Sequence, residues 1–420
     1  MKATIGKGAA GGTAAAPPSK SYTIRALFAA ALAEGESCIH DPLISDDTEA
    51  AAGVLSQLGT KIERHSDYWA VSGGHLNPPL QRLNCRQSAA TLRFLAPVSA
   101  TLEGTSLITF APGLARRPMT PLFDIFSQLG VSSELTDNYL NIHGTGGKLN
   151  ANDISLPGNI SSQFISGLLL AAPSISGGLT IRLSTRAESR DYLLMTIDCL
   201  RKFGIEVESN NTFTEFKVKR QIYKPADYTV EGDWSSASYF LGLGAISSPM
   251  TVNGLNPDSF QGDRFMLNCL RRMDAELTVK EDRVTVSPSH LKSLDADLNE
   301  AIDLLPTVAC LAAVAEGQST LTGLSRARLK ESDRVKATAE NLSRMGIRVE
   351  EAHDSLVIIG GNPHGAMIDS FDDHRIVMAF AMLAAVCGDT VVNGAECVDK
   401  TYPGFWADFK KAGGKVILDE

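Results

Sequence analysis

Residues 54–63 read VLSQLGTKIE, and residues 125–134 read IFSQLGVSSE. In each stretch an amphipathic run ends on an apolar residue and a glycine, and a β-like run follows. The same pattern returns four more times, as CLRKFGIEVE at 199–208, CLRRMDAELT at 269–278, NLSRMGIRVE at 341–350 and DFKKAGGKVI at 408–417. These six copies of one helix-to-strand junction carry the prediction of the fold.

The junctions are almost evenly spaced. The residues at the turn are Gly59, Gly130, Gly204, Asp274, Gly346 and Gly413, which lie 71, 74, 70, 72 and 67 residues apart. Glycine ends a helix in the left-handed conformation without a Cβ clash, and aspartate is among the residues that tolerate it best. One such junction is common in any α/β protein, but six copies over the whole chain favour a repeat. Units of about 70 residues are larger than ordinary solenoid repeats and predict six small αβ subdomains, three in each lobe.

A second set of predicted helices is rich in alanine and poor in charge. Examples are 24–32, 164–172, 306–315 and 376–386. Helices that are apolar nearly all round are buried. Each unit therefore combines one exposed and one buried helix, which indicates a layered α/β fold.

Composition limits the function. The 420 residues favour two or three domains, and 44% hydrophobic with 21% charged residues is ordinary for a globular protein. The net charge of 39 − 48 = −9 makes general binding to nucleic acid or to a membrane surface a poor hypothesis. Seven cysteines without a CxxC pair indicate a reducing compartment, with neither a disulfide framework nor a zinc site. No apolar leader stands at the N-terminus, and the longest apolar run has twelve residues, so we expect a soluble cytoplasmic protein.

Several buried helices begin with polar residues: PPSKSYTIR at 17–25, GNISSQ at 158–163, IDLLP at 302–306 and DDHR at 372–375. Free N–H groups and the helix dipole make such starts anion sites, although Ser, Asp and Asn are also ordinary N-caps. Lys20, Arg25 and Arg375 favour the anion, because a cation opposes the dipole unless something negative lies in front. RLKESDR at 328–334 could equally be an ion-paired helix face. Metal-ligand spacing, a phosphate-binding Walker loop and a dinucleotide fingerprint are all missing from the sequence.

Six motifs in order resemble those of the 5-enolpyruvylshikimate-3-phosphate (EPSP) synthase family. They are PPSKSYTIRAL at 17–27, GNISSQFISGLLLAAP at 158–173, VEGDWSSASYFL at 230–241, RLKESDR at 328–334, DDHRIVMAF at 372–380 and KTYPGFWADF at 400–409. The resemblance implies a two-lobed inside-out α/β barrel of six βαβαββ repeats, three per lobe. It also implies a continuous lobe at 18–231, a discontinuous lobe at 1–17 plus 232–420, and helix starts that face a cleft between them.

The resemblance also implies the chemistry. The family transfers the enolpyruvyl group of phosphoenolpyruvate to the 5-hydroxyl of shikimate 3-phosphate by addition and elimination of phosphate, without a metal or organic cofactor. Both substrates are anions, so a net-negative protein needs a focused set of cations. We expect these small molecules to be its partners, with no nucleic acid or membrane, and we expect a monomer.

Site residues follow from the matching positions. Implied contacts to shikimate 3-phosphate are Lys20, Ser21, Arg25, Ser161, Ser162, Gln163, Ser189, Tyr192, Asp303 and Lys330. Implied contacts to phosphoenolpyruvate are Lys20, Ala89, Arg93, Arg117, Gln163, Arg334, Arg375 and Lys400. Asp303 is implied as the base on the 5-hydroxyl. Glu331 is implied in proton transfer at the enol carbon, and Lys20 competes for that role.

Two positions depart from the family pattern. Ala89 stands where most members have a glycine beside phosphoenolpyruvate, and Arg326 stands where an asparagine is frequent. Two other readings stay open. The sister enzyme acting on UDP-N-acetylglucosamine usually has A-K-N at the Ser19-Lys20-Ser21 position and a loop cysteine near Arg116 and Arg117. A non-catalytic anion-binding homologue would have lost the residues that carry the reaction.

Overall fold

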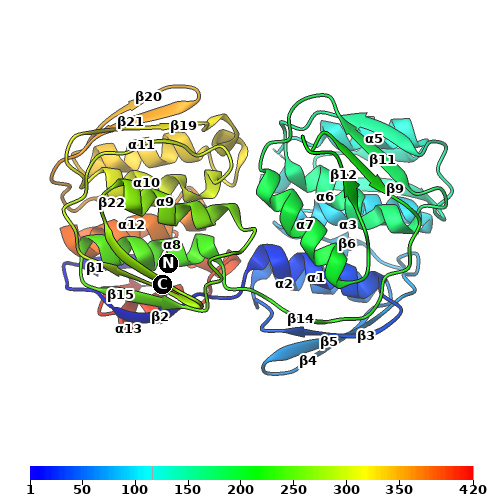
Figure 1. Cartoon of the computed structure of the whole chain (residues 1–420), viewed down its shortest axis with the longest axis horizontal. Helices are drawn as coiled ribbons and strands as arrows, with labels where there is room; N and C mark the ends of the chain where they lie inside the picture. The colour runs from blue at the N-terminus through cyan, green and yellow to red at the C-terminus, as the bar shows by residue number, and fades with distance from the viewer. Residues whose placement is uncertain (116, 420) are drawn as a thin grey trace. The chain divides into compact units, whose positions relative to one another are not determined.

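The computed structural model describes residues 1–115 and 117–419, and its internal contacts divide the chain into two units (Figure 1). Unit 1 contains Met1–Pro17 and the chain from Glu231 onward, and unit 2 is Pro18–Val230. The sequence analysis predicted that the continuous lobe ends at residue 231. Glu231 instead belongs to unit 1, where its carboxylate accepts hydrogen bonds from Asn256, Ser259 and Gln261.

Unit 2 holds three four-stranded sheets. In sheet order they are β14 (Asp227–Thr229), β3 (Gly35–His40), β5 (Tyr68–Gly73) and β4 (Lys61–Arg64); β6 (Leu83–Asn84), β7 (Glu103–Thr109), β9 (Tyr139–Thr145) and β8 (Ser132–Leu135); and β10 (Asp153–Leu156), β11 (Leu179–Leu183), β13 (Glu215–Val218) and β12 (Glu208–Ser209). In each sheet the first two strands are parallel and the others pair antiparallel. The last strand of the unit, β14, pairs with its first, β3, and so closes the first repeat.

Unit 1 repeats this arrangement. Its sheets are β2 (Gly12–Ala15), β15 (Met250–Asn253), β17 (Arg283–Ser287) and β16 (Glu276–Lys280); β18 (Asp295–Asp297), β19 (Gln318–Thr322), β21 (Ser355–Ile359) and β20 (Arg348–Glu351); and β22 (Met367–Asp369), β23 (Thr390–Asn393), β1 (Lys2–Gly6) and β24 (Lys415–Asp419). The N-terminal segment supplies one strand to each of two sheets, and β1 pairs antiparallel with the C-terminal strand β24. The six predicted repeats are therefore confirmed.

One helix in each repeat leads into the predicted turn. These are α2 (Asp46–Gln57), α5 (Thr120–Leu129), α7 (Arg190–Lys202), α9 (Met266–Arg272), α11 (Arg334–Arg344) and α13 (Phe405–Lys411). The turn residue that follows each has a positive φ, from 59° at Asp274 to 102° at Gly59. The prediction that Asp274 replaces a glycine in the left-handed conformation is therefore confirmed.

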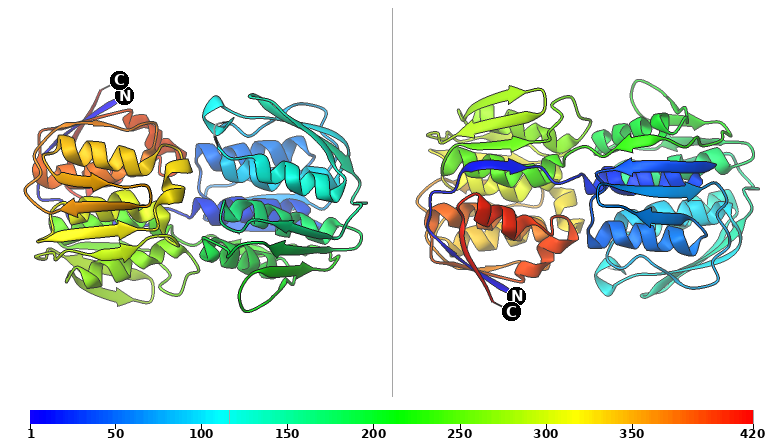
Figure 2. Two further views of the ribbon diagram at one scale, coloured as in Figure 1. Left: turned by 90° about the horizontal axis from the view of Figure 1, so that it is seen from above. Right: turned by 90° about the horizontal axis from the view of Figure 1, so that it is seen from below.

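The other helix of each repeat is buried. In unit 2 these are α1 (Lys20–Leu32), α3 (Ala89–Thr101) and α6 (Ser162–Ala171); in unit 1 they are α8 (Trp234–Ile246), α10 (Leu305–Ala312) and α12 (His374–Cys387). α8, α10 and α12 pack against one another, and α3 packs against both α1 and α6. Each unit thus has its own apolar core, with helices packed between its small sheets (Figure 2).

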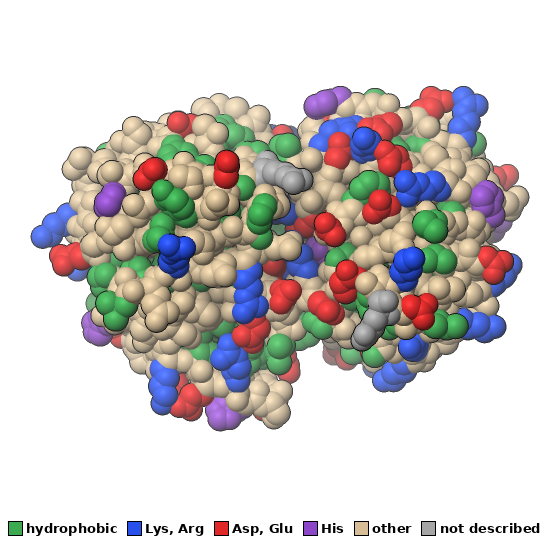
Figure 3. Space-filling model, turned by 180° about the vertical axis from the view of Figure 1, so that it is seen from behind, with side chains coloured by type: hydrophobic (Ala, Val, Ile, Leu, Met, Phe, Trp, Pro, Cys, Tyr) green, Lys and Arg blue, Asp and Glu red, His purple; other side chains and the backbone are tan. Residues whose placement is uncertain are grey.

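Short helices connect these elements. They are α4 (Pro112–Ala115) and the 3₁₀ turns η1 (Ala172–Ser174), η2 (Gly262–Phe265), η3 (Ile302–Leu304), η4 (Ser325–Leu329) and η5 (Ala395–Lys400). Across the described ranges, every helix is too short or too polar for a membrane span. The face in Figure 3 carries acidic and basic side chains side by side.

Candidate active site

Three helix starts and the end of one 3₁₀ turn in unit 1 carry four of the predicted site residues. Asp303 lies in η3, just before α10; Arg334 is the first residue of α11; Arg375 is the second residue of α12; and Lys400 ends η5. Aspartates cap two of these helices, since Asp333 accepts from the N–H of Lys336 and Asp373 from the N–H of Arg375. Capping by Asp333 and Asp373 therefore fixes the first turns of α11 and α12, from which Arg334 and Arg375 extend.

Arg334 is the centre of this group, and its side chain is only 1% exposed. Its guanidinium donates to Asp303 Oδ1 at 2.6 Å, to Glu331 Oε2 at 2.6 Å and to Asp373 Oδ2 at 2.7 Å. A second bond to Asp373 Oδ1 measures 3.2 Å. These three carboxylates raise the pKa of Arg334 against the effect of burial. The planar fork of arginine suits such a hub, because it presents five donors in fixed directions.

Asp303 is buried among three cations. Besides Arg334, Lys330 Nζ lies 3.1 Å from Oδ1 and Arg375 Nη2 lies 3.1 Å from Oδ2. Burial favours the neutral acid, but the charges of Arg375, Lys330 and Arg334 hold the pKa of Asp303 well below its ordinary value. Burial also lowers the pKa of Lys330. Asp303 is therefore an ionised carboxylate at neutral pH and, with these partners, a weak base.

Glu331 and Lys400 extend the same network. Glu331 Oε1 lies 3.7 Å from Lys400 Nζ, while its other oxygen accepts from Arg334. Both side chains are 11% exposed. All six predicted site residues of unit 1 thus belong to one connected charge network, which we call the unit 1 cluster: Asp303, Lys330, Glu331, Arg334, Arg375 and Lys400.

The start of α1 carries the first cations of unit 2. Lys20, the first residue of this helix, pairs with Asp47 Oδ2 at 2.9 Å. One turn later Arg25 donates to Thr196 Oγ1 at 2.8 Å and to the Ser21 carbonyl at 2.9 Å. A third bond reaches the Tyr192 carbonyl at 3.2 Å, so this contact joins α1 to α7.

The environment of Arg25 is apolar as well as polar. The guanidinium carbon lies 5.2 Å from the centre of the Phe94 ring and 5.9 Å from that of Tyr192. Burial lowers the pKa of Arg25. The aromatic faces and the three oxygen acceptors compensate in part for the lost water.

Arg93, on α3, ties that helix to the start of α6. Its guanidinium donates to Gln163 Oε1 at 2.8 Å, to Ser161 Oγ at 3.4 Å and to the Pro118 carbonyl at 3.1 Å. Ser161 is also the N-cap of α6 and accepts from the N–H of Gln163. Ala89 begins α3 and is buried, with the N-cap Ser88 just before it.

Ser189 is the N-cap of α7 and has φ 54° and ψ 48°. A residue other than glycine in this left-handed region is strained, and such strain gathers at functional sites. Ser162 is buried in the first turn of α6, and Arg117 and Tyr192 are half-buried. Arg116, the sequence neighbour of Arg117, lies outside the described residues.

Sequence reasoning missed two important partners. Asp373 was part of the quoted DDHR motif without a role, yet it is completely buried and binds Arg334 twice. Asp47, the partner of Lys20, lies in the first turn of α2. Acidic residues are common there because they interact favourably with the helix dipole, so the sequence alone does not indicate a second role. Arg326, the departure near the shikimate phosphate motif, donates to the carbonyl and the side-chain oxygen of Asn299.

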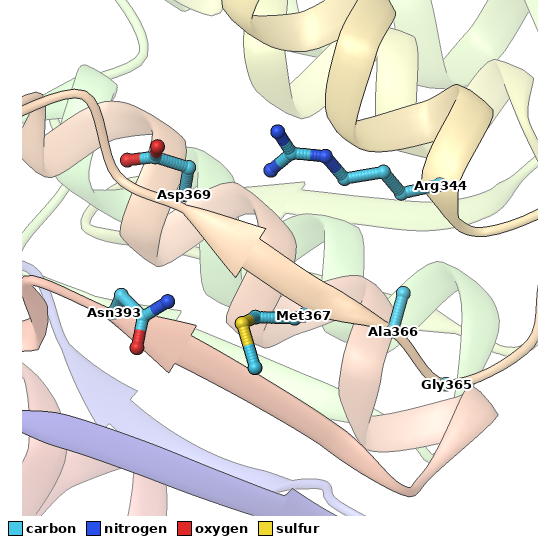
Figure 4. A pocket seen from close by; sticks show the side chains of 6 residues that line it. All are labelled: Arg344, Gly365, Ala366, Met367, Asp369 and Asn393. Atoms are coloured by element: carbon cyan, nitrogen blue, oxygen red, sulfur yellow. The ribbon is translucent and has the colours of Figure 1, made fainter.

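A surface pocket of unit 1 contains none of the predicted residues. It is lined by Arg344 of α11, by Gly365, Ala366, Met367 and Asp369 at and before β22, and by Asn393 of β23 (Figure 4). In the described ranges, 1–115 and 117–419, His, Cys, Asp and Glu side chains form no group of three or more that could hold a metal ion.

Comparison with known proteins supports the family that the motifs resemble. Residues 6–409 match the family described as EPSP synthase (3-phosphoshikimate 1-carboxyvinyltransferase). Relatives named 3-phosphoshikimate 1-carboxyvinyltransferase include those of two strains of Dehalococcoides mccartyi, each 48% identical over 421 residues and the full length of both chains. The relative of that name from Clostridium kluyveri is 39% identical and covers 95% of this chain and 94% of its own.

Solved structures agree. EPSP synthase from Acinetobacter baumannii superposes with a TM-score of 0.83 at 25% identity, covering 99% of this chain and 100% of that one. The enolpyruvyl transferase NikO from Streptomyces tendae shares the fold, with a TM-score of 0.80 at 19% identity over 99% and 98% of the two chains. The chain belongs to the EPSP synthase family.

Proposed function

We propose that the unit 1 cluster and the helix starts of unit 2 carry out the reaction of this family. The chain is a carboxyvinyltransferase of the shikimate pathway, which transfers the enolpyruvyl group of phosphoenolpyruvate to the 5-hydroxyl of shikimate 3-phosphate and releases phosphate. The observation that carries the assignment of roles is the buried network in which Arg334 holds Asp303 and Glu331 among cations. The reaction on UDP-N-acetylglucosamine is not favoured.

Substrate binding is, in this proposal, an exchange of ionic partners. Lys20 pairs with Asp47, Lys330 with Asp303 and Lys400 with Glu331. The phosphate and carboxylate groups of the substrates would replace these protein carboxylates. Charge-assisted bonds to a phosphate are at least as strong as those to a carboxylate, so the exchange can be favourable.

Asp303 takes the proton of the 5-hydroxyl. With Lys330 and Arg375 beside it, its low pKa makes it a poor base. Once a substrate anion neutralises those two cations, the pKa of Asp303 rises towards its ordinary value and its power as a base increases. The base is therefore activated by the substrate.

Glu331 and Lys20 are the two candidates for proton transfer at the enol carbon. Glu331 is fixed by Arg334 and faces Lys400, whereas Lys20 is held by Asp47. Arg334, predicted to bind phosphoenolpyruvate, would have to give up a carboxylate to do so. We assign it first to the orientation of Asp303 and Glu331.

The remaining contacts are proposed as the motifs place them. Shikimate 3-phosphate is bound by Lys20, Ser21, Arg25, Ser161, Ser162, Gln163, Ser189, Tyr192 and Lys330. Phosphoenolpyruvate is bound by Lys20, Arg93, Arg117, Gln163, Arg375 and Lys400, with Ala89 beside it. We propose that the enzyme acts as a cytoplasmic monomer, which sedimentation analysis would test directly.

A phosphate-release assay tests the function. We expect phosphate only when phosphoenolpyruvate and shikimate 3-phosphate are both present, with the enolpyruvyl ether seen by NMR. Omission of either substrate, and replacement of shikimate 3-phosphate by UDP-N-acetylglucosamine, serve as controls. Release with the nucleotide sugar in place of shikimate 3-phosphate, or no release with the correct pair, would overturn the proposal.

A further inference from the structure

Asp263 is a buried carboxyl that none of the assigned roles uses. It lies in η2 and is 4% exposed. Its Oδ2 accepts a hydrogen bond from the hydroxyl of Ser235, at the second position of α8. Its Oδ1 is also buried and has no hydrogen-bond partner. Within residues 1–115 and 117–419, one neutral hydroxyl is therefore the polar group that this carboxyl binds directly.

The charged groups around Asp263 do not pair with it. η2 packs against α8, α9 and η3. Its neighbour in sequence, Arg264, donates to the Pro257 carbonyl, and the α9 arginines Arg271 and Arg272 are exposed. Among residues 1–115 and 117–419, no cation lies within ion-pair distance of Asp263. A buried carboxylate without a cation is costly, so the neutral acid is the favoured form.

The charges that act on Asp263 come from the unit 1 cluster and from the cap of α8. Burial raises the pKa of Asp263 to about 7, the negative charges of Asp303 and Asp233 add to this effect, and Arg375 and the hydrogen bond from Ser235 oppose it. Arg375 already donates to Asp303 at 3.1 Å. An ionised Asp263 would repel Asp303 and attract the same arginine.

We propose that Asp263 is a positioning residue of the transferase reaction: a protonated carboxyl, bound to Ser235, that leaves Arg375 to Asp303 before binding and to the substrate anion afterwards. This inference rests on the proposed role of Arg375 in binding phosphoenolpyruvate. The neutral form of Asp263 is the competent one, and its ionisation in alkaline solution adds a buried carboxylate that competes with the substrate anion for Arg375. Turnover therefore falls as Asp263 loses its proton.

Infrared spectroscopy tests the protonation state without substrate. The difference spectrum between wild type and Asp263→Asn at pH 6 should contain the carbonyl stretch of a protonated carboxylic acid, and the band should disappear by pH 8.5. Asp282→Asn, which removes an exposed aspartate of the same unit, should leave the band unchanged. If wild type lacks the band at pH 6, Asp263 is ionised and the proposal fails, whatever the activity.

The pH dependence of kcat at saturating substrate tests the consequence. With a pKa of about 7, the protonated fraction falls about 30-fold between pH 6 and pH 8.5, which bounds the loss of kcat. The ratio of kcat at the two pH values should be well above one in wild type and in Asp282→Asn, and close to one in Asp263→Asn. Equal ratios in all three proteins would overturn the proposal. If Asp263→Asn does not fold, the titration of the wild-type band decides.

Discussion

Replacement of Arg334 by methionine removes the centre of the unit 1 cluster while keeping a side chain of similar length. The wild-type guanidinium makes four hydrogen bonds to Asp303, Glu331 and Asp373. Asp373 is completely buried, and Ser332 is its other side-chain donor, at 3.0 Å. Arg334→Met therefore leaves three carboxylates close together, and among the described residues Asp373 keeps only the Ser332 hydroxyl, the N–H of Arg375 and the His374 ring at 3.8 Å.

The expected loss of stability is large. Removing one partner of a buried ion pair typically costs about 3–5 kcal/mol, because the remaining charge stays buried without compensation. Here Lys330, Arg375 and Lys400 still serve Asp303 and Glu331, so the uncompensated charge is mainly that of Asp373. We expect about 3–5 kcal/mol for Arg334→Met. Arg334→Lys keeps the charge but cannot reach all three carboxylates, so it should fall between this variant and wild type.

Urea unfolding followed by tryptophan fluorescence measures the effect in the correct unit. Trp234 and Trp406 lie in unit 1, and Trp69 lies in unit 2. In a Trp69→Phe background, tryptophan fluorescence therefore reports the unfolding of unit 1 alone. With a denaturant slope of about 3 kcal/mol/M, the midpoint of Arg334→Met should fall by about 1 M or more.

Lys336→Met is the matched control, because it removes an exposed cation from the same helix. The side chain of Lys336 forms an ion pair of 3.6 Å with Glu340, and surface changes of this kind are usually within about 0.5 kcal/mol. If Arg334→Met unfolded within 1 kcal/mol of the control, the carboxylates would not depend on Arg334, and its assignment as the hub would be wrong.

Three further predictions concern the chemistry and its pH dependence. Asp303→Asn and Glu331→Gln should each lower kcat by about 10²–10⁴-fold while binding persists in calorimetry, and turnover within threefold of wild type would remove that residue's role. The low pKa of Asp303 means that its ionised form stabilises the folded protein at neutral pH. This stability is lost as the pH falls from about 4, the ordinary pKa of aspartate, through the pKa of Asp303 in the folded state. The free energy of unfolding of Asp303→Asn should therefore decrease less in acid than that of wild type. The family resemblance implies glyphosate as an inhibitor at the phosphoenolpyruvate site. It should bind about 5- to 150-fold more tightly to Ala89→Gly than to wild type, because the methyl group proposed beside that site would overpack it by about 1–3 kcal/mol. Equal inhibition constants, measured together with the KM for phosphoenolpyruvate, would contradict this.

The fold could be predicted from sequence because its determinants are local. A helix ending in an apolar residue and a left-handed turn needs only neighbouring residues, and Asp274 shows that even the exception follows the backbone rule. The pairing of strands from segments far apart in the sequence could not be predicted in this way. β14 pairs with β3 and β2 with β15 across long separations, and short strands such as GTAA carry no signal for their partner.

The sequence motifs predicted the cations of the unit 1 cluster and two of the acids that pair with them. Motif matching named Asp303, Glu331 and the residues that bind them, but it gave Asp373 no role and did not reach Asp263. Both are buried carboxyls whose significance depends on what lies opposite them. For Asp373 that is Arg334, and for Asp263 it is a hydroxyl with no cation. Sequence spacing does not report such contacts between elements.

The pairing of cations with protein carboxylates links binding to activation. Without substrate, Lys330 and Arg375 are occupied by Asp303, and Lys400 by Glu331. These acceptors are also the groups proposed to move protons, so each stays a weak base until an anion takes its cation. A single bound substrate neutralises only part of the network. We therefore propose that proton transfer waits until both substrates are bound, which would protect the reactive enol ester from a premature reaction with water.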